Sequence, residues 1–168
     1  MIQNKITISP TAHIADESVM AGEVTIGSDS SVFYYSALRG DMSPITIQNC
    51  TNIQENCVLH VDSEHPVYIG NGVTIGHGCI IHGCEIGDNS LVGMGSTVMT
   101  GVKIGRNCLI GAGSLVTQNT VIPDGMLAFG SPAKVIRPLT EQELAKIYKS
   151  RDTYIELSRN LFGNYDAK

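Results

Sequence analysis

The sequence lacks the long apolar runs and the basic clusters that mark two large classes of protein. Its 168 residues contain no apolar run close to the roughly 18 residues that a membrane-spanning helix needs. The formal net charge is −5, and the 11 basic residues form no cluster. Nucleic acids and anionic membrane surfaces attract proteins through clustered positive charge. We therefore expect no nucleic acid and no membrane as a partner.

The beginning of the chain also lacks the features of a secretory signal. A signal peptide needs a basic segment followed by a long apolar stretch, whereas this chain begins MIQNKITISPTAHIADES. This absence predicts a cytoplasmic location. The composition, with 42% hydrophobic residues and 18 glycines, is sufficient for a continuous core with many turns.

What the sequence does contain is a period of six. A period of 3.6 would indicate a helix stripe and a period of 2 a strand face. A strict six, with Gly after several of the repeated residues, indicates short strands separated by turns, which is typical of a solenoid. The repeated aliphatic residues are Ile14, Met20, Ile26, Val32 and Leu38, then Ile86, Val92, Val98, Ile104, Ile110, Val116 and Ile122.

This pattern resembles the hexapeptide-repeat family. The resemblance implies an all-β solenoid, a left-handed parallel β-helix in which three hexads make one coil. The hexads here correspond to about six to seven coils. We expect residues 1–125 to form this domain and residues 126–168 to form a linker and a C-terminal α-helix that packs on the solenoid. That helix should cover about 141–161, because Thr140 and Glu143 form a capping box before an amphipathic pattern.

Four of the five cysteines fit the repeat as core residues. Cys57, Cys79, Cys84 and Cys108 each stand two residues before a repeated aliphatic residue. Positions two apart on a strand share a face, so these side chains should point inward and pack as small hydrophobes. Cys50 is off this register, and its role stays open.

Two insertions interrupt the hexads, at 39–46 and at 61–67, and we expect them to form loops that project from one edge. His60 and His82 lie 22 residues apart, which equals one coil plus the four extra residues of the second insertion. They should therefore occupy the same outward position on adjacent coils, about 4.8 Å apart, where two imidazoles can share a metal ion.

His77 stands two residues after Ile75, one hexad earlier, which should put it beyond a corner on another side of the solenoid, so within one chain it should not reach the same ion. A neighbouring subunit could present it, and threefold symmetry would then create three equivalent sites. The alternative is that these histidines are simply solvated or hydrogen-bonded. His13 and His65 do not belong to this stack of histidines. We expect His13 to have a structural role, and His65 lies in the second insertion.

Together with the three histidines, several segments of the sequence resemble the gamma-class carbonic anhydrases, in the short bacterial form that lacks a long acidic loop. The resemblance implies that His60, His77 and His82 bind zinc or another divalent ion between the subunits of a homotrimer. The matching segments are ALRGD (37–41), TNIQENCVLHV (51–61), TIGHGCIIHGCEIG (74–87), GMGS (93–96), IGAGSLV (110–116) and GSPAKVIRPL (130–139).

The resemblance also implies roles for four further residues. Gln54, six residues before His60, would hydrogen-bond the metal-bound water or bicarbonate, with Asn52 as its polar neighbour. Arg39 and Asp41 match a pair at the subunit interface that orients neighbouring groups. A salt bridge within a turn is the alternative for this pair.

A site with three histidines leaves a coordination position for water, which is typical of catalytic metal centres. The implied reaction is the reversible hydration of CO₂ to bicarbonate. The native metal stays open among Zn²⁺, Fe²⁺ and Co²⁺. The proton carrier is also open: Asp62, Glu64 and His65 are candidates, or the loop that contains them is only solvated. Residues 126–130, where some relatives place a Tyr near the metal, contain none.

Two other functions remain possible. The chain could be a hexapeptide acyltransferase or a thioesterase that acts on coenzyme A esters, because GSPAK fits those proteins as well. It could also bind metal without hydratase activity.

Overall fold

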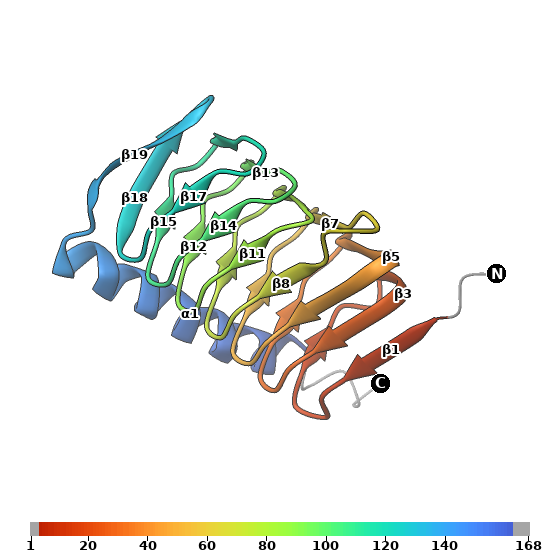
Figure 1. Ribbon diagram of the computed structural model, residues 1–168. Helices are drawn as coiled ribbons and strands as arrows, with labels where there is room; N and C mark the ends of the chain where they lie inside the picture. Colours follow the sequence, from red (N-terminus) through yellow and green to blue (C-terminus); the bar gives the residue numbers. More distant parts are fainter. Residues whose placement is uncertain (1–3, 163–168) are drawn as a thin grey trace.

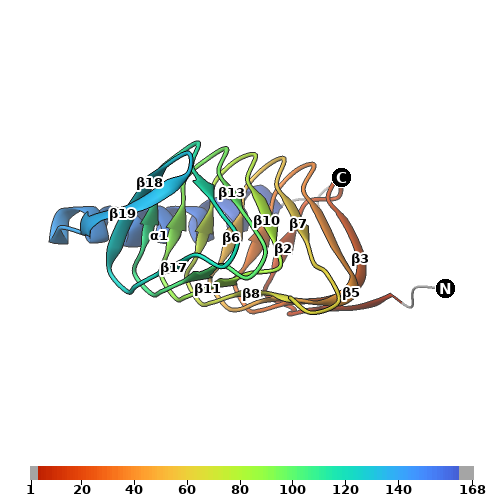
Figure 2. The same cartoon turned by 45° about the horizontal axis from the view of Figure 1, so that its top comes forward.

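The computed structural model describes residues 4–162, which form a solenoid of stacked triangular coils with one long helix along its side (Figures 1 and 2). We name its three faces the helix face, the histidine face and the outer face. The strands of the helix face are β2 (His13–Ile14), β4 (Ser31–Val32), β6 (Asn52–Ile53), β9 (Thr74–Ile75), β12 (Leu91–Val92), β15 (Leu109–Ile110), β18 (Met126–Gly130) and β19 (Ala133–Pro138).

The other two faces form one continuous sheet that bends at a corner. Two long strands, β3 (Val19–Ile26) and β5 (Ala37–Ile47), pass this corner and contribute to both faces. The histidine face continues with β7 (Val58–His60), β10 (Ile80–His82), β13 (Thr97–Val98) and β16 (Leu115–Val116). The outer face contains β1 (Lys5–Ile8), β8 (Val67–Ile69), β11 (Glu85–Ile86), β14 (Lys103–Ile104) and β17 (Val121–Ile122).

Parallel pairing between successive coils confirms the predicted left-handed β-helix. Seven parallel strands, from β2 to β18, stack on the helix face, which corresponds to about seven coils. β18 pairs in parallel with β15, so the repeat extends to Gly130, and β19 then returns antiparallel to cover the end of this face. The division of the chain at residue 125 stays a prediction.

The repeated aliphatic residues form the core, as expected. Most have almost no solvent exposure, among them Val32, Leu38, Ile86 and Ile110. Cys57, Cys79, Cys84 and Cys108 are buried between them as free thiols. Burial raises the pKa of the Cys84 thiol to about 12, which suits a residue that only packs.

The insertion at 39–46 does not form the projecting loop that the sequence predicts. Its residues lie within β5, an 11-residue strand that bends past the corner with an irregular register against β3. Backbone pairing on both sides of the corner satisfies more amides than a free loop would. Ser43 Oγ also donates to the carbonyl of Asp62 at 2.6 Å, which joins the two insertions.

The C-terminal helix α1 (Glu141–Phe162) runs along the helix face, against β2, β4, β6 and β9 (Figure 1). The predicted capping box is confirmed, because Glu143 N donates to Thr140 Oγ1 and Thr140 N donates to Glu143 Oε2. Arg151 and Tyr148 bond to Asn89 and Asn107, two turn residues of the solenoid. In the part of the chain that the structure describes, no helix is long and apolar enough to cross a membrane.

Candidate metal centre

His60 and His82 end two neighbouring strands of the histidine face. The register pairs them directly across β7 and β10, which confirms the stacking expected from their spacing. His60 Nδ1 lies 3.2 Å from His82 Nε2, and the two ring centroids are 5.0 Å apart. Arg39 is the register partner of His60 on β5, so the three side chains follow one another on three successive coils. We call His60 and His82 the histidine pair.

The remaining nitrogen of each ring in the histidine pair has its own partner. His60 Nε2 lies 3.1 Å from Asp41 Oδ1, and His82 Nδ1 lies 2.9 Å from Thr100 Oγ1. If each of these nitrogens carries the ring proton and donates it, the two nitrogens that face each other both carry lone pairs. Two lone pairs at 3.2 Å repel unless a proton or a cation lies between them.

This arrangement fits a metal ion. Two nitrogens, each about 2.0–2.1 Å from a tetrahedral cation, lie roughly 3.3 Å from each other, close to the observed separation. Metal-binding histidines commonly donate the other ring N–H to a carboxylate or another oxygen, as His60 would to Asp41. Within residues 4–162, however, no group of three or more His, Cys, Asp or Glu side chains is arranged to hold a metal. One chain therefore supplies two converging nitrogens.

Local electrostatics keep this half of the site ready to bind a cation. Burial raises the pKa of Asp41, but hydrogen bonds from Arg39 and His60 outweigh it, so the net pKa lies below the ordinary value. Burial, together with the nearby His60, lowers the pKa of His82. The carboxylate is thus ionised and the His82 imidazole neutral at pH 7, the forms in which an orienting group and a ligand act.

His77 lies at a different corner, in the turn between β9 and β10. Its Nδ1 is 2.6 Å from Glu55 Oε2, and its Nε2 is 3.4 Å from the hydroxyl of Tyr154 on α1. Tyr154 packs edge-on against Phe33, and burial, followed by the charge of Glu55, raises its pKa. The structure therefore separates His77 from the histidine pair, as the spacing of the hexads predicts.

Gln54 and Asn52 belong to the corner of His77. Gln54 Oε1 accepts the backbone N–H of His77 at 3.1 Å, and Gln54 Nε2 donates to Asn52 Oδ1 at 3.2 Å. Asn52 in turn donates to Thr74 Oγ1, and both amides are almost fully buried. Neither makes a hydrogen bond to His60 or His82. We call His77, Gln54, Glu55 and Tyr154 the corner group.

Arg39 and Asp41 form an ion pair within the chain, through Arg39 Nη1 and Asp41 Oδ2. Because Asp41 also bonds to His60, it lies directly behind the histidine pair. The Arg39 side chain is half exposed, so its outer part remains available to another chain. The structure thus supports the alternative of a salt bridge within one chain and adds a contact to His60, while a role at an interface stays a prediction.

An apolar row crosses the histidine face beside the histidine pair. Its residues are successive register partners, and two of them, Val58 and Ile80, are 44% and 48% exposed. The equivalent row on the outer face includes Glu85 and Lys103, whose charged groups lie 3.8 Å apart. The apolar row consists of Val19, Ala37, Val58, Ile80, Thr97 and Leu115.

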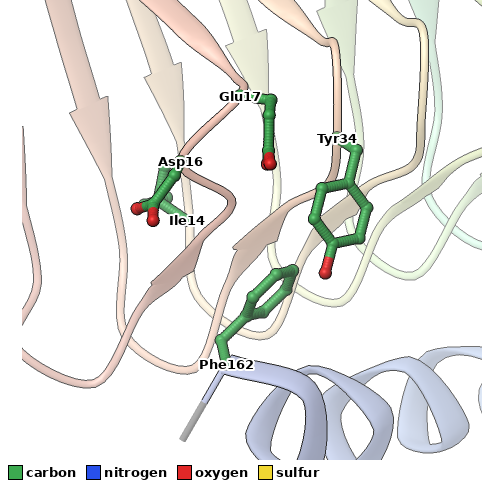
Figure 3. A pocket seen from close by; sticks show the side chains of 5 residues that line it. All are labelled: Ile14, Asp16, Glu17, Tyr34 and Phe162. Atoms are coloured by element: carbon green, nitrogen blue, oxygen red, sulfur yellow. The ribbon is translucent and has the colours of Figure 1, made fainter. Parts of the chain in front are cut away.

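A small pocket of about 100 Å³ lies elsewhere, between the first coils and the end of α1 (Figure 3). The carboxylates of Asp16 and Glu17 and the ring of Tyr34 surround it, with Phe162 at one side. None of the predicted site residues lines this pocket.

Sequence reasoning missed three residues of the site. Tyr154 lies on α1, far from the segment in which a Tyr was sought, and only the packing of the helix brings it to His77. Glu55 was detectable, because it stands one coil before His77 at the same corner. Thr100 was also detectable, because it is 18 residues after His82.

The comparisons with known proteins agree with this fold. Residues 83–118 match the family described as bacterial transferase hexapeptide (six repeats). A Methanocaldococcus jannaschii protein named probable carbonic anhydrase is 50% identical over 154 residues, covering 92% of this chain and 97% of that protein. A Geobacillus kaustophilus carbonic anhydrase is 42% identical over 149 residues, covering 89% and 82%.

A solved structure of a Bacillus cereus protein, presumed to be an acetyltransferase, has a TM-score of 0.94 and 40% identity, covering 96% of this chain and 94% of that one. The fold and the repeat place the protein among the hexapeptide-repeat β-helices. Within that class, the chain belongs to the gamma-class carbonic anhydrase-like family.

Proposed function

We propose that this protein is a metal-dependent hydratase that converts CO₂ reversibly to bicarbonate, with each site completed between two chains of a homotrimer. The observation that carries the proposal is the histidine pair, whose facing nitrogens are spaced for one cation. The names of the relatives support the reaction. Zn²⁺ suits neutral imidazoles, and Fe²⁺ or Co²⁺ would bind to the same donors. A cytoplasmic location stays part of the proposal.

The third ligand would be His77 of a neighbouring chain. The corner of His77 begins the histidine face, and the histidine pair ends it. If three copies pack with their histidine faces toward a common axis, the corner of one copy meets the far edge of the next. Such packing would also cover the apolar row, whose exposed Val58 and Ile80 favour burial. These observations support a trimer over a monomer.

A divalent ion held by three nitrogens would leave a position for water and lower its pKa to near 7, a behaviour best known from carbonic anhydrase itself. Asp41 would hold the His60 ring in the orientation that aims Nδ1 at the ion. Glu55 would do the same for His77, leaving Nε2 as the ligating nitrogen once Tyr154 yields its place. Gln54 and Asn52 would supply amide groups beside the reactants.

The transferase names among similar proteins keep acyl transfer or thioester hydrolysis as the main alternative. A histidine acting as a general base needs only one free nitrogen. It does not explain two nitrogens that converge while their other nitrogens are bonded to Asp41 and Thr100. The third possibility, metal binding without hydration, shares all of the geometry and differs only in activity.

The test is metal content and CO₂ hydration of protein purified without oxygen, compared with His82→Ala. Removal of one imidazole should empty the site and abolish activity, because the other two hold the ion poorly. His13→Ala is the matched control: it removes an imidazole from β2 and should retain metal and activity. If wild-type protein loaded with Zn²⁺ or Fe²⁺ hydrates CO₂ no faster than His82→Ala, the hydratase proposal is wrong, and thioester substrates should be assayed next.

A further inference from the structure

Tyr35 combines a strained backbone with an exposed aromatic ring. It stands in the turn before β5 with a φ of +61°, in the left-handed region. A bulky residue is an outlier there, because its Cβ crowds the backbone. Its exposed fraction of 69% is the highest among the large hydrophobic residues of 4–162. Strain that the surrounding structure maintains is a pointer to function, and here the ring does not serve the core.

The equivalent turns of the later coils contain residues that suit this conformation. The strand register places Asn56, Gly78, Gly95 and Gly113 at the same corner on successive coils. All four have a positive φ, and Asn and Gly adopt it most readily. The fold of this turn therefore does not require the side chain of Tyr35.

The ring of Tyr35 also differs from that of its neighbour Tyr34. Tyr34 faces the end of α1, where its ring centroid lies 5.7 Å from that of Phe162 (Figure 3). Within residues 4–162 the Tyr35 hydroxyl has no hydrogen bond, and its ring contacts no other ring. Of two adjacent tyrosines, one thus packs on its own chain and the other is available to another molecule.

Tyr35 lies at the edge of the face that we propose to join the chains. Ala37, a member of the apolar row, follows two residues later, and Arg39 stands at the far end of the same face. Val19, the exposed register partner of Ala37, belongs to the same row. Tyr35 therefore extends the apolar row to the corner at which a neighbouring chain would meet it.

The group that would meet Tyr35 follows from the position of each coil along the solenoid. His77 begins the histidine face on its coil, and His82 ends that face on the same coil. The proposed site joins these two residues from different chains. A threefold axis parallel to the solenoids keeps all copies at one height, so each corner meets the far end of its own coil in the neighbour. By the same rule, Tyr35 of one chain meets Arg39 of the next.

The chemistry of the two side chains is complementary. Arg39 Nη1 bonds to Asp41 Oδ2, but the Arg39 side chain remains 54% exposed. A guanidinium is attracted to the face of an aromatic ring, and it stacks through its flat side while its N–H edge bonds to a carboxylate. Tyr and Arg are also the residue types that contribute most often to the binding energy of interfaces. Stacking would therefore leave the bond between Arg39 and Asp41 intact.

We propose that Tyr35 anchors the contact between chains by stacking on Arg39 of the neighbouring chain; this rests on the trimer of the proposed function. Asp41 bonds to both Arg39 and His60. The ring thus also restrains the arginine that helps to hold Asp41 behind the histidine pair. Assembly and the orientation of His60 are coupled through this one contact.

The experiment is sedimentation velocity of wild type and Tyr35→Gly over a dilution series. Glycine removes the anchor and the strain together, because it adopts a positive φ readily. The protein concentration at which half of the trimer dissociates should rise roughly 10-fold, since truncation of an anchor residue is repeated at three contacts. In dilute samples where both proteins are monomers, the melting temperature of Tyr35→Gly should equal or exceed that of the wild type.

Three further variants assign the effect to the ring and to its partner. Cys50→Gly is the matched control: it replaces another residue with positive φ, at the corner between the outer face and the helix face, and should leave the trimer unchanged. Tyr35→Phe keeps the ring and should keep the trimer. Arg39→Lys removes the flat guanidinium and should weaken the trimer, and combining it with Tyr35→Gly should add little further loss.

The outcomes distinguish this inference from the proposed function. A wild-type trimer whose dissociation is unaffected by Tyr35→Gly would overturn the anchor and leave the shared site intact. Fully additive losses from Tyr35→Gly and Arg39→Lys would contradict the pairing of these two residues. A lower melting temperature of the monomeric Tyr35→Gly chain would show that the ring supports its own chain. A wild type that is monomeric at every concentration would overturn both proposals.

Discussion

In the proposed trimer the histidine pair and the corner group would form the two halves of one site, and the two groups are built differently. The histidine pair stands at the ends of two paired strands, and its partners Asp41 and Thr100 come from the same edge of the solenoid. The corner group gathers residues from a turn, a buried amide network and α1. The strand ladder alone sets the first half, whereas the second depends on how the helix packs.

This difference in construction indicates which of the two groups is already in place in a single chain, before a trimer assembles. Parallel pairing fixes the spacing of His60 and His82 at the distance between coils, so no assembly is needed to bring them together. Nε2 of His77, the nitrogen proposed to bind the ion, faces the Tyr154 hydroxyl, so binding would exchange that contact for the ion. We therefore expect the histidine pair to determine where the metal binds and the corner group to determine whether it stays.

The largest effect should come from separating the two halves. Ile80→Glu places a carboxylate in the middle of the apolar row, where burial of an unpaired charge costs on the order of several kcal/mol. The trimer should dissociate to monomers of 18.0 kDa and lose its metal, as measured by light scattering and metal analysis.

Val121→Glu is the matched control for this change. Val121 is also an exposed β-branched residue, but it lies on β17 of the outer face, so the trimer should persist. Circular dichroism should show that both variants remain folded. A trimeric, metal-loaded Ile80→Glu protein would show that the histidine faces do not meet.

An intermediate effect should come from removing one orienting group from each half. Asp41→Ala frees the His60 ring, and Gln54→Ala frees the His77 turn and leaves its backbone N–H without an acceptor. Each should weaken metal affinity about 10–100-fold, the usual range for groups that hold a ligand in place. Competition with a chromogenic chelator measures both affinities.

Light scattering on dilution separates orientation from assembly in the same two variants. If Asp41 acts through His60, Asp41→Ala should keep the trimer while it loses affinity. Dissociation of the trimer before any loss of metal would instead assign Arg39 and Asp41 to the interface, as the family resemblance implies.

Much of this arrangement follows from the sequence, and the reason is the repeat. A strict period fixes which residues stack, so the intervals alone predicted the His60–His82 pair, the inward cysteines and the separation of His77. The insertion at 39–46 was predicted wrongly as a loop, because a long strand that turns a corner satisfies its backbone and leaves no signal in the hexads.

The contacts of α1 could not be predicted in the same way. An amphipathic helix shows that one face is covered, but it does not show which residue of the solenoid meets Tyr154. The hydrogen bonds of the Gln54 side chain could not be predicted from the spacing either. Its position follows from the period, but its hydrogen bonds to the His77 turn depend on amide orientation, which no sequence interval encodes.

The smallest effect should come from Tyr154→Phe. The hydroxyl of Tyr154 lies 3.4 Å from His77 Nε2, at the long limit of a hydrogen bond, while the ring contact with Phe33 would remain. Metal affinity should change by less than about fivefold, which corresponds to under ~1 kcal/mol. Because the phenol competes with the ion for Nε2, the change should be an increase. A large decrease would show that Tyr154 supports the bound state.

The most direct test of the shared site is complementation between two defective chains. One chain carries His77→Ala and keeps the histidine pair, and the other carries His60→Ala with His82→Ala and keeps His77. Each alone should bind no metal and lack activity. After unfolding and refolding together, every mixed trimer should contain one intact site, so an equimolar mixture should regain roughly a quarter of wild-type metal and activity. If the mixture stays empty while wild-type protein refolded in the same way binds metal, His77 does not act across the interface, and the account is wrong.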